Sequence, residues 1–161
     1  MEKTEFDNAA RQYQDMVYRI ALHHFADSFD AEDAVQEVFL RLFIWGKPFE
    51  SGEHLRRWLI RVTVNVCPDT LKSPWRKRRV PLDALPEQPV FDRPEQGELY
   101  RAVMALPEKY RTVLDLFYYE ELSTREIAEV LHIRQTAVTT RLARAREQLK
   151  HQLTEVWQDE E

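Results

Sequence analysis

The sequence contains little glycine, almost no cysteine and no long apolar segment. Only three of its 161 residues are glycine, and together with long amphipathic runs this favours helices throughout. The single cysteine, Cys67, excludes an internal disulfide framework and suits a reducing cytoplasm. No apolar run approaches the roughly 20 residues of a membrane-spanning helix, and the acidic start lacks the apolar core of a signal peptide. We therefore expect a cytoplasmic protein.

The net charge of −5 hides an uneven distribution of charge along the chain. Residues 54–80 hold eight Lys and Arg against one acidic residue, and residues 134–150 hold five against one. Residues 1–53 are acidic, with five Lys and Arg against eleven Asp and Glu. A polyanion could bind at the two basic segments, while the acidic remainder limits non-specific association.

Prolines divide the chain into two parts. Four of the eight prolines lie in residues 80–95. Because proline is excluded from helix interiors, this segment is expected to be a semi-extended linker. Helical periodicity continues on both sides of it. The sequence therefore predicts an all-α protein of two small helical domains, residues 1–73 and 95–161, joined by a proline-rich linker at 74–94.

The first domain is expected to begin with two amphipathic helices. Apolar residues recur at helical spacing over residues 6–24. The second helix is predicted to begin at Asp30, a favourable N-cap residue, with Asp33 in its first turn. Its expected apolar face consists of Ala34, Val35, Val38, Phe39, Leu42 and Phe43.

A loop at residues 46–52 is expected to lead to a third helix. This helix is predicted to begin near Glu53 and to kink or end near Cys67, because Pro68 removes a backbone donor and crowds the preceding residue. The residues expected to be buried are Leu55, Trp58, Leu59, Val62 and Val66.

The second domain is expected to hold four helices. The first covers residues 96–106, and the second begins at Pro107, which suits a first helical turn, and runs to about Glu120. The last two helices cover residues 123–131 and run from 134–135 past position 149. A tight turn at His132 and Ile133 separates them.

The last two helices have the spacing of a helix-turn-helix. Ser123 and Glu126 form an S-x-x-E capping box, and the second helix is expected to bury an apolar stripe and expose a basic face. A helical hairpin with a solvated basic face is the alternative, and the cations Arg146 and Lys150 could simply complement the helix dipole. The capping box, the turn and the basic helix together favour DNA binding, since hydroxyls reach phosphates and arginine binds phosphates or guanine edges. The candidates are Arg134, Thr136, Thr139, Thr140, Arg141 and Arg144.

Several segments of the sequence resemble those of a known family. Residues 121–149 (ELSTREIAEVLHI…VTTRLARAREQL) resemble region four of the extracytoplasmic-function (ECF) sigma factors, a compact branch of the sigma-70 family. Residues 30–43 (DAEDAVQEVFLRLF) resemble the signature of the family's N-terminal domain, and residues 56–79 resemble the helix that follows it. Residues 105–123 resemble the start of region four. The resemblance covers nearly the whole chain in the family's order.

The resemblance implies a protein that is not an enzyme and needs no cofactor. Such proteins bind core RNA polymerase and place it at promoter DNA. The C-terminal domain reads the minus-thirty-five element as duplex, and the N-terminal domain reads the minus-ten element as melted single strand. A cognate anti-sigma factor, often bound to the membrane, is a further expected partner, and it can hold such proteins at the inner membrane face.

The resemblance also assigns a role to the second helix. In the family, its exposed surface docks on the clamp helices of the polymerase. This implies that Asp33, Gln36, Glu37 and Arg41 bind core polymerase. Without the resemblance, a solvated amphipathic helix with acidic residues near its N-terminus would be the simpler interpretation.

In the family, the loop before the third helix and the exposed face of that helix contact the non-template strand. Cations and aromatic rings together suit unstacked bases and phosphates. Trp58 is expected to belong to the core, and residues 75–79 (WRKRR) are either a nucleic-acid contact or a solvated charge cluster. The minus-ten candidates, carried over from residues 47–65, are Phe49, Arg56, Arg57, Arg61 and Asn65.

Three positions depart from the family pattern. The family often has glycine at the turn, where this chain has His132, and a non-glycine residue at positive φ costs on the order of 1 kcal/mol. It often has Gly-Thr-Val at the start of the recognition helix, where this chain has residues 136–138 (TAV). Pro68 is the third departure. Promoter preference therefore cannot be borrowed from the family.

Two other functions remain as alternatives. A stand-alone helix-turn-helix regulator would need a dimer interface or a ligand pocket, and no periodic zipper is present. An enzyme or metal protein would need a motif, but the histidines and Cys67 show no compact ligand spacing. Phosphate-loop and nucleophile motifs are absent from the sequence, so no catalytic or metal-binding residue is predicted.

Overall fold

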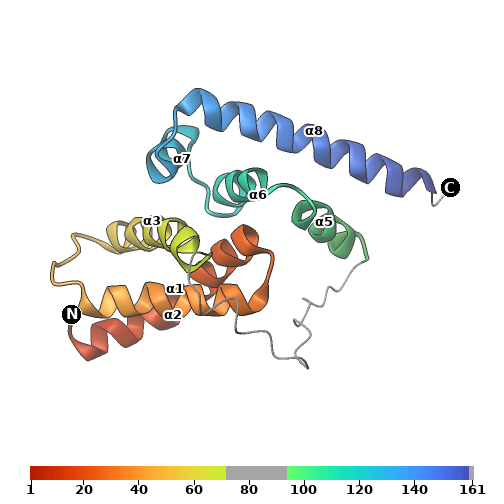
Figure 1. The fold of residues 1–161 in the computed structure, drawn as a ribbon. Coiled ribbons are helices and arrows are strands. Elements are labelled where there is room, and N and C mark those ends of the chain that lie inside the picture. Colours follow the sequence, from red (N-terminus) through yellow and green to blue (C-terminus); the bar gives the residue numbers. More distant parts are fainter. Residues whose placement is uncertain (72–93, 160–161) are drawn as a thin grey trace. The chain divides into compact units, whose positions relative to one another are not determined.

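The computed structural model describes residues 1–71 and 94–159, with side chains placed for residues 1–66 and 96–154. Helices are the only regular elements in these residues, which confirms the all-α prediction (Figure 1). The chain separates into two compact units, residues 1–86 and 87–161. Residues 74–93 of the predicted linker, and with them the basic run at 75–79, lie outside the described residues. No helix in the described parts is long and apolar enough to cross a bilayer.

The first unit is built from three helices, α1 (Lys3–Phe25), α2 (Ser28–Ile44) and α3 (Gly52–Leu71), and each packs against the other two (Figure 1). Each helix contributes one stripe of apolar side chains to a shared core, as the 3.6-residue period allows. Burial of such side chains contributes about 1.5–3 kcal/mol each, so packing stabilises these helices more than intrinsic propensity does. The core includes Val17, Ile20, Ala31, Ala34, Val38, Leu42, Leu59, Ile60 and Val66.

The turn between α1 and α2 shows where the second helix really begins. Ala26 adopts a left-handed conformation with φ 56°, and its N–H donates to the carbonyl of Leu22 at 2.8 Å. The carboxylate of Asp27 accepts hydrogen bonds from the N–H groups of Phe29 (2.8 Å) and Asp30 (3.1 Å). The predicted N-cap at Asp30 is therefore wrong. Both aspartates can cap a helix, but Asp30 is buried within the first turn that Asp27 caps.

The prediction for the end of α3 offered two outcomes, a kink or an end near Cys67. An end there is wrong, because the helix continues to Leu71, and a kink stays a prediction. A proline removes its own N–H from the ladder of helical hydrogen bonds, but the residues after it keep theirs. Because Pro68 lies in the last turn of α3, the loss of one bond does not stop the helix there.

The buried face of α3 is wider than predicted, and that of α2 is narrower. On α3, Leu55, Trp58 and Val62 are only half-buried. On α2, Phe43 is 53% exposed and packs edge-on against Phe6, with ring centroids 5.4 Å apart. The α3 residues that are fully buried are Leu59, Ile60, Thr63, Val64 and Val66.

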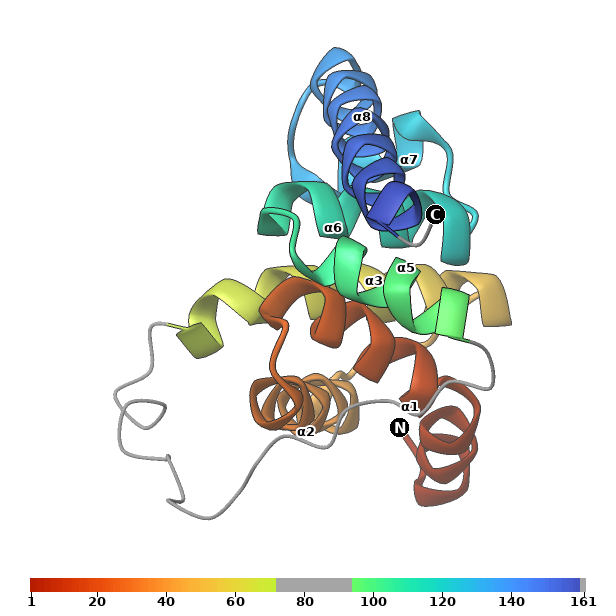
Figure 2. The ribbon, with the colours of Figure 1, turned by 90° about the vertical axis from the view of Figure 1, so that its right-hand side faces the viewer.

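The second unit contains α5 (Pro94–Met104), α6 (Glu108–Leu114), a π-helix η1 (Asp115–Tyr119), α7 (Thr124–Leu131) and α8 (Gln135–Asp159). Helices α5, α6 and α7 all pack against α8. Figure 2 looks nearly along α8 and shows α6 and α7 beside it. The core side chains are Leu106, Val113, Leu116, Ile127, Val138, Leu142 and Ala145.

A half-buried arginine holds the connection between α5 and α6. Pro107 is the N-cap residue of α6 rather than its first helical residue. A guanidinium nitrogen of Arg111, Nη1, donates to the carbonyls of Met104 (3.2 Å) and Leu106 (2.9 Å). Burial lowers the pKa of Arg111, and the nearby Glu108 carboxylate acts in the opposite direction. The group nevertheless stays charged, because an arginine guanidinium remains protonated in proteins.

The helix predicted to run to about Glu120 changes type part of the way along. The segment after α6 is wound as a π-helix, in which the N–H of Glu120 donates to the carbonyl of Asp115 at 3.1 Å. The N–H of Leu122 then donates to the carbonyl of Leu116 at 3.0 Å. These bonds keep both leucines buried. Of the three aromatic residues between them, Tyr118 and Tyr119 are exposed and Phe117 is half-buried.

The turn between α7 and α8 has the predicted capping box and a strained residue. The Ser123 hydroxyl accepts from the Glu126 N–H, and the Glu126 carboxylate accepts from the Ser123 N–H, both at 3.1 Å. His132 ends α7 in the left-handed conformation, with φ 57° and ψ 42°, and its N–H donates to the carbonyl of Ala128. His132 therefore occupies this turn at positive φ although it is not a glycine.

Replacing this histidine by glycine should stabilise the second unit. We expect His132→Gly to raise the free energy of unfolding by about 0.5–1 kcal/mol, because glycine adopts positive φ without a steric penalty. The gain stays small because glycine also makes the unfolded chain more flexible. Urea unfolding followed by circular dichroism measures the change. His132→Val, which places a β-branched residue at the same φ, should destabilise the unit, and equal stability of the two variants would contradict this account.

Candidate functional site

The outer face of α8 carries the predicted DNA-binding residues together. Val138, Leu142 and Ala145 are buried on its inner face, and Leu149 is half-buried. Arg141 is half-buried at the edge of the outer face. The remaining predicted residues, Arg134, Thr136, Thr139, Thr140 and Arg144, are exposed.

The threonine hydroxyls on this face can still accept hydrogen bonds. Thr139 and Thr140 each donate their hydroxyl hydrogen to the carbonyl of Thr136, at 2.9 Å. A hydroxyl group has two lone pairs in addition to its hydrogen. In their present rotamers these side chains can therefore accept hydrogen bonds from base amino groups. To donate a hydrogen bond to a phosphate, each hydroxyl must first rotate away from the Thr136 carbonyl.

A hydrogen bond that the sequence did not predict joins the starts of α7 and α8. The side-chain nitrogen of Gln135, Nε2, donates to the hydroxyl of Thr124 at 2.9 Å. Together with the capping box, it ties the first turn of the recognition helix to the first turn of its partner. No local sequence motif predicts this bond, because the two residues are 11 positions apart.

A shallow groove of about 490 Å³ runs between α6 and α8. One wall comes from Lys109 and Tyr110 of α6, and the other from residues of α8 and of the turn before it. The sequence did not single out Lys109, which lies well before the helix-turn-helix. The fold thus adds one cation to a groove that also contains Arg134, Arg141 and Arg144.

Arg146 lies elsewhere and makes a different contact. Its Nε donates to the hydroxyl of Tyr118 at 2.6 Å, and its guanidinium carbon lies 5.6 Å and 5.5 Å from the ring centroids of Phe117 and Tyr118. The side chain therefore joins α8 to η1. The dipole explanation for Arg146 and Lys150 is wrong, because α8 continues to Asp159 and neither residue lies in its last turn.

In the first unit, the predicted polymerase-binding residues lie along the outer side of α2. Gln36 is exposed, whereas Asp33, Glu37 and Arg41 are half-buried. The Nε of Arg41 donates to the Glu37 carboxylate at 3.1 Å. An exposed pair of this kind contributes little to stability, typically about 0–1 kcal/mol, so both groups can exchange partners.

The sequence reasoning missed an apolar residue on the same side of α2. Leu40 is 56% exposed and follows Gln36 by four residues, so the two side chains are neighbours on the helix surface. Ile44, four residues further along, is 71% exposed. The sequence could have indicated this exposure, because Leu40 is an apolar residue outside the predicted apolar stripe. Exposed large apolar residues beside polar ones are typical of binding surfaces.

Aromatic rings gather where the loop after α2 meets α3. The ring centroid of Phe49 lies 5.6 Å from that of Trp58 and 5.2 Å from that of His54. Trp45, which the sequence did not single out, lies 5.3 Å from Trp58, and the Lys47 ammonium lies 5.7 Å from the Trp45 ring. Trp58 is half-buried in this cluster rather than in the core, so that prediction is wrong.

The predicted basic residues of α3 fall on two sides of the helix. Arg57, Arg61 and Asn65 are exposed at four-residue spacing, which places them on one stripe. Arg56 is half-buried, with 23% of its side chain exposed. Both Arg56 and Arg57 donate to the same carboxylate oxygen of Glu53, at 3.1 Å. The structure therefore brings three of the four polar candidates onto one surface.

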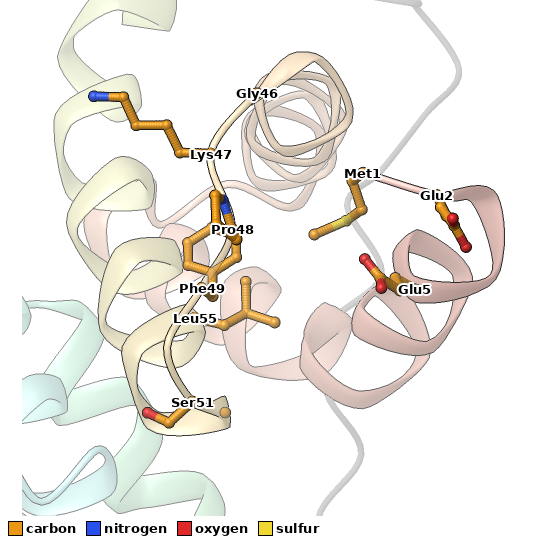
Figure 3. A pocket seen from close by; sticks show the side chains of 10 residues that line it. Met1, Glu2, Glu5, Gly46, Lys47, Pro48, Phe49, Ser51 and Leu55 are labelled. Carbon is orange, nitrogen blue, oxygen red and sulfur yellow. The ribbon is translucent and has the colours of Figure 1, made fainter.

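A cavity of about 690 Å³ lies between the loop at residues 46–52 and the start of α1 (Figure 3). Phe49 is the one predicted site residue that lines it. The hydroxyl of Tyr13 on α1 donates to the carbonyl of Gly52 at 3.2 Å, which holds the start of α3 against α1. The sequence gave no sign of this cavity, because its walls lie about 45 residues apart in the chain.

Comparison with known proteins agrees with this architecture. Residues 9–77 match the family model for sigma-70 region 2, and residues 96–149 match that for sigma-70 region 4. The ECF RNA polymerase sigma factor SigW of Bacillus subtilis is 31% identical, over 89% of this chain and 86% of its own length. SigE of Mycolicibacterium smegmatis is 33% identical, over 92% of this chain and 61% of its own length.

A solved structure shows the same fold. The sigma factor RpoE of Bartonella quintana, crystallised with the anti-sigma factor NepR, superposes with a TM-score of 0.73 at 17% identity. The match covers 93% of this chain and 97% of that one. With both family models matched in order, the chain belongs to the ECF sigma factors of the sigma-70 family.

The contact between Arg146 and Tyr118 should stabilise the second unit. We expect Arg146→Ala to lower the free energy of unfolding by about 1 kcal/mol, because it removes a hydrogen bond and exposed cation–π contacts. Tyr118→Phe keeps the ring and removes only the hydroxyl, so its effect should be about half as large. Urea unfolding measures both. Additive losses in the double variant would show that the two side chains do not act together.

Proposed function

We propose that this sigma factor binds core RNA polymerase and directs it to promoters by reading two DNA elements. Residues 95–161 would read a minus-thirty-five element as duplex, and residues 1–73 a minus-ten element as melted single strand, with residues 74–94 as the linker. The protein acts by binding rather than by catalysis. The observation that carries the proposal is that one chain combines a helix-turn-helix bearing a basic groove with a separate basic and aromatic surface on α3.

The α8 face suits duplex DNA. A recognition helix enters the major groove with its N-terminal part, and the exposed residues of α8 begin at that end. Arginine can read guanine edges, whereas the groove cations, including Lys109, suit the phosphates beside the helix. The proposed contacts are Arg134, Thr136, Thr139, Thr140, Arg141 and Arg144, with Lys109 added.

The α3 surface suits an unpaired strand. Single strands are held by cations along the backbone and by aromatic rings that stack on bases. Arg57, Arg61 and Asn65 provide a polar stripe, and Phe49 lies in an aromatic cluster at its start. Arg57 can leave Glu53 for phosphate, because exposed ion pairs are weak. The proposed minus-ten contacts are Phe49, Arg56, Arg57, Arg61 and Asn65.

The outer side of α2 suits a protein partner. Asp33, Gln36, Glu37 and Arg41 offer polar contacts, and Leu40 provides an exposed apolar group among them. Protein interfaces combine a few buried anchors with a polar rim. We assign this side of α2 to core polymerase.

A cognate anti-sigma factor belongs to the proposal as well. The Bartonella quintana relative was crystallised with the anti-sigma factor NepR, and an equivalent partner would keep this chain from the polymerase until a signal releases it. We place the protein in the cytoplasm, where its DNA and polymerase partners are. An anti-sigma factor bound to the membrane would hold it at the inner face.

The alternatives have less support. A stand-alone regulator would leave the outer surfaces of α2 and α3 without a partner. For a metal protein, no three His, Cys, Asp or Glu side chains gather at a possible metal site within residues 1–66 and 96–154.

Promoter selection by the reconstituted polymerase tests the proposed function. The full chain should enable core polymerase to transcribe a subset of templates from a library with two randomised elements, and should bind the same templates weakly alone. Run-off transcription with sequencing gives the first result, and mobility shifts without core give the second. Equal binding of selected templates without core, and no transcription with it, would instead support the stand-alone regulator.

Leu40 tests the assignment of α2. Leu40→Ala should weaken binding to core polymerase about fivefold or more, because a central apolar anchor typically contributes over 1 kcal/mol. Leu99→Ala is the matched control, since Leu99 is a 47% exposed leucine on α5 in the other unit. Fluorescence anisotropy of labelled protein against core polymerase measures both affinities. Equal affinities of the two variants would rule out Leu40 as an anchor.

A further inference from the structure

The cavity beside the aromatic cluster has two chemically different walls. One wall is apolar and comes from Pro48, Phe49 and Leu55. The other comes from Met1, which precedes α1, and from Glu5 in its first turn, and both side chains point towards the loop (Figure 3). A volume of about 690 Å³ is in the range of small-ligand sites. The cavity is therefore a site where a planar group could lie on apolar side chains with its edge towards α1.

Two carboxylates belong to the α1 wall, and Figure 3 shows Glu5 turned towards the loop and Glu2 turned away from it. Within the described part of the chain, Glu5 makes no hydrogen bond or ion pair. Lys47 also lines the cavity, but its ammonium points away from Glu5 and lies 5.7 Å from the Trp45 ring (Figure 3). The Ser51 hydroxyl accepts from the His54 N–H at 3.1 Å. The carboxylate of Glu5 is thus available as an acceptor for whatever enters.

We propose that Glu5 selects the base that this cavity receives, accepting a hydrogen bond from an exocyclic amino group and rejecting thymine. The inference rests on the proposed function, because it takes the ligand to be an unstacked base of the melted strand. An extruded base is recognised through its Watson–Crick edge and by apolar or aromatic side chains beside its ring.

The chemistry of the four bases explains the selection. Adenine, cytosine and guanine each carry an amino group that can donate to a carboxylate, as in the known pairing of Glu with cytosine N4. Thymine has no amino group, and its single Watson–Crick donor, the N3–H, lies between two carbonyl oxygens that would face the negative charge of Glu5. A carboxylate cannot donate to those oxygens, so they would lack a partner wherever the bound base excludes water.

A purely structural role for Glu5 makes a different prediction. Acidic residues in a first helical turn stabilise the helix through its dipole. That role would change stability without changing base preference. Asp7 is the matched control, because it is an exposed carboxylate on α1 that does not line the cavity.

Base preference should be measured with the full chain assembled with core polymerase. The probe is a template library in which every base of the downstream element is randomised, and the transcripts are sequenced. For the unaltered protein we expect one position at which thymine is depleted on the order of tenfold. Glu5→Ala should reduce this depletion to within about twofold at that position alone. Glu5→Gln should do the same, because its amide can donate to a thymine carbonyl.

The outcomes separate this inference from the proposed function. Selection that persists at the other positions shows that the Glu5 variants are folded and active. Thymine depletion that survives Glu5→Ala, or an equal effect of Asp7→Ala, overturns the inference while the sigma-factor function stands. If the unaltered protein with core polymerase selects no template at all, the proposed function fails and the inference fails with it.

Discussion

Every binding surface in this protein depends on the burial of one stripe of each helix. An α-helix repeats every 3.6 residues, so a stripe packed into the core determines which side chains remain for partners. On α8, the burial of Val138, Leu142 and Ala145 leaves the threonines and Arg144 outside. On α3, the burial of Leu59 and Ile60 leaves Arg57 and Arg61 outside. The cores and the binding faces are therefore two consequences of the same periodicity.

Features that depend on neighbouring residues could be predicted from the sequence. The capping box of Ser123 and Glu126 covers four consecutive residues, and the turn at His132 comes soon after it. The start of α2 was harder to predict, because Asp27 and Asp30 lie three residues apart and both can cap a helix. Only the burial of Asp30 in the folded protein decides between them. Leu40 could have been found, since its position in the helical period already placed it outside the apolar stripe.

Features that depend on distant residues could not be predicted in this way. Arg146 meets Tyr118 across 28 positions, and Tyr13 meets Gly52 across 39. Neither contact leaves a local pattern, because any exposed arginine or buried tyrosine fits the helical period equally well. The same is true of Lys109 and Glu5, which line a groove and a cavity only because the fold brings another segment beside them.

The π-helix η1 has a consequence for how this chain compares with its relatives in length. A π-turn holds one more residue than the α-turn it replaces, so the segment can absorb an insertion while Leu116 and Leu122 both stay buried. A relative lacking one residue there could close the same segment with an ordinary α-turn. This change would affect the exposed tyrosines, because one of them would be missing or would point in another direction. Alignments of this module should therefore place length differences within residues 115–119 and leave the helix-turn-helix ungapped.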